Sequence, residues 1–186
     1  RGAARCAQTD MYDDTGLHGR HSLRLAGYDY RQCGAYFVTV CVHDREELLG
    51  TIESGEMSLS AAGRAVTEAW HSIPQRFAVV HLDSYVAMPN HVHGLLWLDA
   101  SAEPQDGGAS RNSRATGPSL GEIMRAFKSL SAIAANRVLG RGGVPFWQRN
   151  YYEHIVRNDD ELDQIRRYIV SNPAQWADDP DNVHST

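Results

Sequence analysis

The feature that most limits what this chain can fold into is a pair of apolar runs separated by Pro89-Asn90. The first run is AVVHLDSYVAM (78–88), and the second is HVHGLLWL (91–98). Both have the β-branched and aromatic content of strands, and Pro-Asn between two such runs is a turn signal. The two runs therefore predict an antiparallel hairpin.

Five further segments have a helical period, strand-like composition or strong boundary signals. Ser119 followed by Glu122 fits a capping box at the start of one helix, and Asn158 followed by acidic residues opens another. The predicted elements are a strand at 34–43, a helix at 58–77, a helix at 119–140, a strand at 151–157 and a helix at 158–173.

With the hairpin included, the order is strand, helix, strand, strand, helix, strand and one more helix. The first six elements are the ferredoxin-like β-α-β-β-α-β pattern. The order therefore predicts an α+β fold, in which two helices cover one face of a four-stranded antiparallel sheet. An added C-terminal helix must pack elsewhere, and its place bears on function.

The length of 186 residues suits one domain. We expect a flexible lead-in at 1–18, a single domain at 19–176 and a tail at 177–186. The stretch 99–118 is rich in Gly, Ser, Ala and Pro, and predicts a loop. No apolar run reaches the roughly 18 residues that a membrane span needs. Three cysteines without CxxC spacing argue against a disulfide framework or a zinc finger, and favour a reducing, cytoplasmic setting.

The formal net charge is -5, which for the whole chain argues against nucleic-acid binding. The charge is unevenly distributed, because ten basic and six acidic residues between Arg111 and Arg167 give a local net charge of +4. This basic half is either an ordinary solvated surface or the lining of a groove for a nucleic-acid strand.

The second strand of the hairpin carries His91 and His93, with Val92 between them. Side chains alternate along a strand, so the two imidazoles point to one face, about 6.5–7 Å apart along the strand. Two such imidazoles can converge on one divalent ion. Alternatively, they are buried histidines satisfied by hydrogen bonds, since a single HxH is a weak motif in a chain with nine histidines.

On the last helix, Tyr168 and Asn172 are four residues apart and share a face. Tyr168 is either a reactive phenol or an amphipathic packing residue. Asn172 is either part of the same site or the C-cap that ends the helix before Pro173.

Taken together, these features resemble the single-tyrosine HUH transposases, and among them the REP-associated tyrosine transposases of bacteria. The similarity spans roughly Ser22 to Trp176. The segments that carry it are SLRLAGYDY (22–30), GAYFVTVCVHDRE (34–46), YVAMPNHVHGLLWL (85–98), LGEIMRAFKS (120–129), FWQRNYYEHIVRNDDEL (146–162) and RRYIVSNPAQW (167–176).

The resemblance implies a role for each matched residue. His91 and His93 match the pair that binds a divalent metal, Mg²⁺ or Mn²⁺, and Asn172 matches the third ligand. Tyr168 matches the nucleophile, which forms a 5′-phosphotyrosine and frees a 3′-OH. The implied substrate is single-stranded DNA beside hairpins such as palindromic repeats, and relatives act as monomers or homodimers.

Three basic residues are our candidates for contacts with DNA phosphates, namely Arg125, Lys128 and Arg149. Tyr151 and Tyr152 are rival nucleophiles to Tyr168. They are adjacent in a predicted strand and point opposite ways, so only one of them can face the site.

Two other functional classes stay open. One is a metal-dependent hydrolase in which the HxH pair activates water. It needs further ligands, and the nearest acids, Asp83 and Asp99, lie at the other end of the hairpin or off it. The other is a non-catalytic nucleic-acid-binding module on the same fold, which would carry aromatic residues in place of the histidines.

Overall fold

The computed structural model describes residues 31–99, 117–179 and 181–182. Four strands form one sheet in the spatial order β4-β5-β1-β6, and every neighbouring pair is antiparallel. The strands are β1 (Gly34–Cys41), β4 (Val80–Ala87), β5 (His91–Leu98) and β6 (Tyr152–Val156). The first strand lies between the third and the fourth of this sheet, so the predicted ferredoxin-like α+β fold is confirmed.

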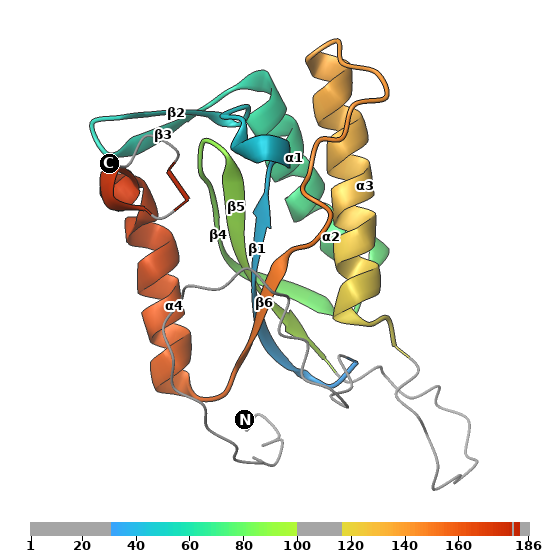
Figure 1. Cartoon of the computed structure of the whole chain (residues 1–186). Helices are drawn as coiled ribbons and strands as arrows, with labels where there is room; N and C mark the ends of the chain where they lie inside the picture. Colours follow the sequence, from blue (N-terminus) through green and yellow to red (C-terminus); the bar gives the residue numbers. More distant parts are fainter. Residues whose placement is uncertain (1–30, 100–116, 180, 183–186) are drawn as a thin grey trace, which may run out of the picture.

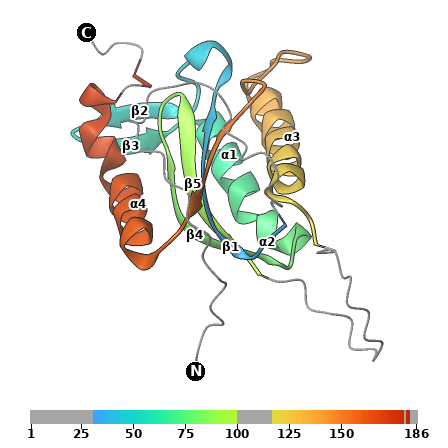
Figure 2. The same ribbon diagram turned by 60° about the horizontal axis from the view of Figure 1, so that its bottom comes forward.

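Helices cover the two faces of the sheet unequally (Figures 1 and 2). On one face lie α1 (Ala61–His71), the short α2 (Ile73–Arg76) and α3 (Leu120–Val138). On the other face lies α4 (Asp159–Ser171), which contacts β4 and β5. The added C-terminal helix thus packs on the face of the sheet opposite α1 and α3.

The helix boundaries follow local hydrogen bonds. The hydroxyl of Ser60 accepts from the backbone N–H of Gly63 and begins α1. Ser119 and Glu122 form the predicted capping box of α3. The Asn158 side chain accepts from the backbone N–H of Glu161 and begins α4, where acidic residues in the first turn complement the helix dipole.

One hairpin was not predicted. Strands β2 (Gly50–Glu53) and β3 (Glu56–Leu59) pair with each other apart from the main sheet. Ser54 and Gly55 have φ values of 54° and 81°, the left-handed conformation that a tight two-residue hairpin turn requires. The predicted helix 58–77 therefore begins later, at Ala61, and Ser72 separates α1 from α2.

Side chains of the sheet divide into two clusters by alternation. Tyr36, Val38 and Val40 of β1 pack with α1 and α3 in the larger cluster. Ala35 and Phe37 of β1 belong to a smaller cluster, completed by Leu95 of β5 and by Leu162 and Ile169 of α4. The smaller cluster lies on the side of the sheet that also carries the two histidines.

The predicted lead-in at 1–18, most of the predicted loop at 99–118 and half of the predicted tail at 177–186 lie outside the described residues. Within the described residues, no helix is both long enough and apolar enough to cross a membrane.

Candidate metal and nucleophile site

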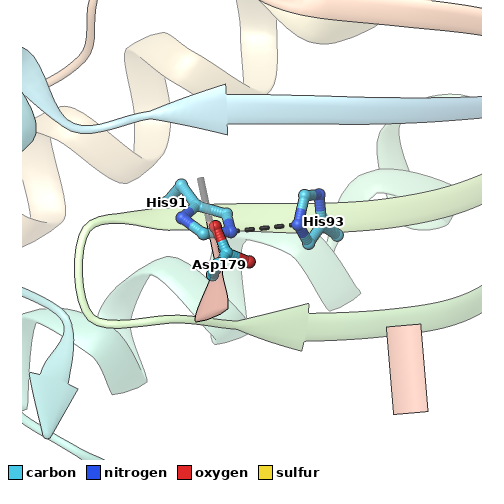
Figure 3. A group of neighbouring side chains, drawn as sticks. All are labelled: His91, His93 and Asp179. Atoms are coloured by element: carbon cyan, nitrogen blue, oxygen red, sulfur yellow. Dashed lines mark hydrogen bonds between the residues drawn. The ribbon is translucent and has the colours of Figure 1, made fainter. Parts of the chain in front are cut away.

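His91 and His93 project from β5 toward the side of the sheet that α4 covers. Both are buried, at 0% and 3% exposure. Their Nε2 atoms are 2.9 Å apart, so the two rings converge on one point (Figure 3). His93 also stacks on Phe37 of β1, with 5.4 Å between ring centroids. The strand thus holds two imidazoles in one place, as the HxH spacing predicts.

The other ring nitrogens have partners of their own. Nδ1 of His93 lies 2.8 Å from the hydroxyl of Thr39, which is directly opposite on β1. Nδ1 of His91 lies 2.8 Å from Oδ1 of Asn90. Because each Nδ1 is engaged, both Nε2 atoms are the ones presented to a ligand.

The environment keeps both histidines neutral. Burial, together with the smaller effect of the nearby Arg45 cation, lowers the pKa of His91 to about 3. Burial also holds the pKa of His93 well below its usual range, and the neighbouring His91 adds to this. Neutral imidazole is the form that binds metal ions, so the pair is available as ligands without first losing a proton to solvent.

Sequence reasoning missed the carboxylate of Asp179. One of its oxygens and one nitrogen from each histidine all lie within 4.8 Å of one another, and all three residues are buried (Figure 3). Burial raises the pKa of Asp179, and the neighbouring charge of Asp181 raises it too. The residue belongs to the segment expected to be a tail, which has no period that would have marked it as buried.

Tyr168 lies beside this cluster. Its hydroxyl is 3.2 Å from Nε2 of His93, and the two ring centroids are 5.1 Å apart. The side chain is 39% exposed, so a substrate can reach it. Burial of the phenol raises its pKa to about 12, the carboxylate of Asp179 acts in the same direction, and a hydrogen bond from Asn172 opposes them.

Asn172 follows α4 directly and is 1% exposed. It occupies the C-cap position of α4, which was one of its two predicted roles. Its side chain also lowers the pKa of Tyr168 and of Asp179, against the effect of their burial. Its Oδ1 is buried without a hydrogen-bond partner among the described residues. A buried carbonyl oxygen without a partner is costly, and an amide oxygen is a ligand that a divalent cation accepts together with imidazole and carboxylate.

Apolar packing and one ion pair fix α4, the helix that carries Tyr168, to the sheet. Ile169 and Leu162 pack against Phe37 and Leu95. Arg166 donates to both carboxylate oxygens of Asp83 on β4, at 3.1 and 2.6 Å. The acid that we considered as a metal ligand is therefore a partner of α4, and its pKa is lowered to about 2, chiefly by this hydrogen bond.

The three basic candidates do not gather at the histidines. Arg125 and Lys128 belong to α3, which covers the opposite face of the sheet (Figure 1). The ammonium of Lys128 donates to the backbone carbonyls of Gln148 and Arg149, at 2.7 and 2.9 Å. Arg125 and Arg149 are exposed. A role of these residues in DNA contact stays a prediction.

The two neighbouring tyrosines separate as strand alternation requires. Tyr151 packs against the larger cluster, and Tyr152 against the smaller one. Tyr152 thus lies on the same side of the sheet as Tyr168, and its ring meets the edge of Phe37 at 6.3 Å between centroids.

Comparison with solved structures identifies the class to which this fold belongs. The chain matches a REP-associated tyrosine transposase that was solved bound to a REP hairpin, with a TM-score of 0.53. The match covers 89% of this chain and 81% of that one, at 17% sequence identity. The chain therefore has the fold of the REP-associated tyrosine transposases.

Comparison by sequence places the chain in a family. It is 37% identical over 180 residues to an uncharacterized protein of Haemophilus influenzae, strain ATCC 51907 / DSM 11121 / KW20 / Rd. That match covers 89% of this chain and 94% of the other protein. The chain belongs to one family with this bacterial protein. No family model matches the sequence.

Proposed function

We propose that this protein is a metal-dependent endonuclease and strand transferase for single-stranded DNA next to hairpins. One observation carries the proposal: the hydroxyl of Tyr168 lies 3.2 Å from Nε2 of His93, whose ring converges with that of His91, all in one chain. The fold supports it, because the structural neighbour with the same architecture was solved with a REP hairpin. The same observation makes a monomer sufficient to build the site, although a homodimer is compatible with it.

The donor set consists of two imidazole nitrogens, the Asn172 carbonyl oxygen and the Asp179 carboxylate. These residues would hold one divalent ion. When bound, the ion supplies positive charge that polarises the phosphate and stabilises the charge that develops on it. Imidazole favours Mn²⁺ over Mg²⁺, which prefers oxygen ligands.

Tyr168 is the nucleophile in this proposal. Its phenol gives up its proton as the oxygen attacks phosphorus, the bond from phosphorus to the 3′ oxygen breaks, and the departing 3′ oxygen takes up a proton. The products are a 5′-phosphotyrosine and a free 3′-OH. In the reverse direction, a 3′-OH attacks the same phosphorus and restores the phenol, so a strand can be joined to a new end.

The experiment that tests the proposal is incubation with a hairpin-bearing single strand and Mn²⁺, followed by a denaturing gel. We expect a covalent protein–DNA adduct that Tyr168→Phe abolishes and that Tyr152→Phe retains. The tyrosine at 152 is the matched control, because it lies on the same side of the sheet. An adduct that persists in Tyr168→Phe and disappears in Tyr152→Phe would transfer the role of nucleophile to Tyr152.

The buried carboxylate of Asp179 favours one second candidate. Two histidines and a carboxylate are also a ligand set with which hydrolases activate water. Such an enzyme would cut DNA without forming an adduct, and Tyr168→Phe would leave its cleavage rate almost unchanged. The same gel distinguishes the two functions.

A further inference from the structure

Asn90 is a fully buried polar residue in the turn between β4 and β5, immediately before the first histidine. Its backbone carbonyl accepts from the backbone N–H of Val42 at 2.8 Å, which fixes the turn to the end of β1. Its side chain makes two hydrogen bonds, one to His91 and one to the backbone carbonyl of Asp181, each 2.8 Å long. The side chain therefore connects a metal-binding histidine to the C-terminal segment.

The chemistry of these two contacts determines which way the amide faces. The carbonyl of Asp181 can only accept a hydrogen bond, so the NH₂ group of Asn90 must face it. The amide oxygen then faces Nδ1 of His91, and that oxygen can only accept. Nδ1 of His91 must therefore carry the hydrogen. In a neutral ring this leaves a lone pair on Nε2, the atom that faces His93.

The second histidine is held differently. In the 2.9 Å contact between the two Nε2 atoms, His91 supplies the lone pair, so His93 supplies the hydrogen. Nδ1 of His93 then accepts from the hydroxyl of Thr39, at 2.8 Å. A hydroxyl donates or accepts as its neighbour demands. His93 can consequently carry its hydrogen on Nδ1 when a cation binds its Nε2. The Thr39 hydroxyl then rotates and accepts a hydrogen bond from Nδ1.

We propose that Asn90 is a positioning residue that presets His91 as a metal ligand by fixing its hydrogen on Nδ1. Thr39 adapts to either tautomer of His93 and presets neither. This inference rests on the metal site of the proposed function. It goes further by assigning unequal roles to two residues that contact the histidines at the same distance and that nothing in the HxH motif distinguishes.

The test compares Mn²⁺ affinity, measured by calorimetry without DNA, in three variants of the full chain. Asn90→Leu keeps the volume and removes the acceptor, and we expect it to weaken binding about 10- to 100-fold, as the loss of such outer partners does at other metal sites. Asn90→Asp keeps an acceptor for Nδ1–H and should retain most of the affinity. Thr39→Val is the matched control at the other histidine and should cost less than Asn90→Leu.

A second readout reports the tautomer directly. Nitrogen-15 NMR of the metal-free protein should show His91 protonated at Nδ1 in the wild type and in Asn90→Asp, and a mixture of tautomers in Asn90→Leu. Thermal unfolding of the metal-free variants checks that each one folds.

The proposal is overturned if Asn90→Leu and Asn90→Asp lose equal affinity, if Asn90→Leu binds Mn²⁺ like the wild type, or if the wild type carries its hydrogen on Nε2 of His91. A wild type that binds no Mn²⁺ would instead refute the metal site of the proposed function. The NMR comparison would still decide whether Asn90 sets the tautomer.

Discussion

At the scale of single residues, the site combines a phenol that is hard to ionise with a buried carboxylate that makes it harder. With a pKa of about 12, only about one Tyr168 in 10⁵ is ionised at pH 7. A cation held by the histidines and Asp179 would offset the negative charge of Asp179. The same residue that opposes the nucleophile without metal would then help to bind the ion that assists it.

Asp179→Asn tests this double effect. We expect Mn²⁺ affinity to fall by at least about tenfold, because a charged ligand is replaced by a neutral one. Asp178→Asn is the control, because Asp178 is adjacent but exposed, and it should bind Mn²⁺ like the wild type. Calorimetric titration of both variants measures the difference, and equal affinities would remove Asp179 from the ligand set.

At this scale, some residues of the candidate site could be predicted from the sequence and others could not. The histidines were predictable, because strand alternation fixes which residues share a face. Asp179 was not, since its burial depends on a segment without period folding back over the sheet. The contacts of Lys128 with the carbonyls of Gln148 and Arg149 were equally invisible, because a lysine on a helix surface looks the same whether it meets solvent or a loop.

At the scale of elements, β5 meets α1 through a contact that requires glycine. A Cβ added at Gly94 would lie 2.3 Å from a ring carbon of Trp70, which is itself fully buried. We expect Gly94→Ala to lower the free energy of unfolding by about 1–3 kcal/mol, as overpacking of a core does.

Urea unfolding measures this change, and Gly34→Ala is the matched control in a neighbouring strand. A Cβ at Gly34 would meet nothing within 4 Å, so its effect should stay within about 0.5 kcal/mol. A wild-type stability for Gly94→Ala would mean that Trp70 moves aside at little cost.

The position of α4 depends on its ion pair with β4. Arg166→Gln removes the two hydrogen bonds to Asp83 but none of the proposed metal ligands. We expect the rate of adduct formation to fall by an order of magnitude or more, because a displaced nucleophile loses its alignment with phosphorus.

Mn²⁺ affinity should change much less than this rate. Arg76→Gln, an exposed site on α2 at the other face of the sheet, controls for the loss of one positive charge. If Arg166→Gln and Arg76→Gln slow the reaction equally, the effect comes from charge and not from the position of α4.

Most elements could be predicted from sequence because their signals are local. The capping box of α3 and the acidic start of α4 mark their ends, and the apolar runs of β4 and β5 mark the hairpin. The hairpin of β2 and β3 could not be predicted in the same way. Its strands have four residues each and lie beside the predicted helix, so a helical period was extended over residues that pair as a strand.

At the scale of the whole molecule, the buried histidines couple stability to pH. The pKa of His91 is about 3 in the folded protein and near 6.5 when exposed. Protonation therefore favours the unfolded chain, and the contribution of this residue to stability is complete above pH 6.5 and is lost as pH falls toward 3.

We expect the metal-free wild type to lose more stability than His91→Gln between pH 6.5 and pH 5. As pH falls below 6.5, the difference should approach about 1.4 kcal/mol per pH unit, which is the limiting value for one group protonated only in the unfolded state. Urea unfolding at several pH values measures both slopes. Parallel slopes would mean that His91 is protonated in the folded protein as well.

Alternation along β5 sends consecutive side chains to opposite faces of the sheet. Val92, Gly94 and Leu96 meet the α1 and α3 layer, while the histidines point to the other face, where His93 contacts Tyr168 of α4. A slip of this central strand by a single position would send both imidazoles in among the tryptophan and the aliphatic residues, and would put valine and glycine where the ion should sit. An insertion or deletion of one residue within β5 should consequently abolish folding and metal binding together. This strand should therefore tolerate substitutions far better than any change in its length.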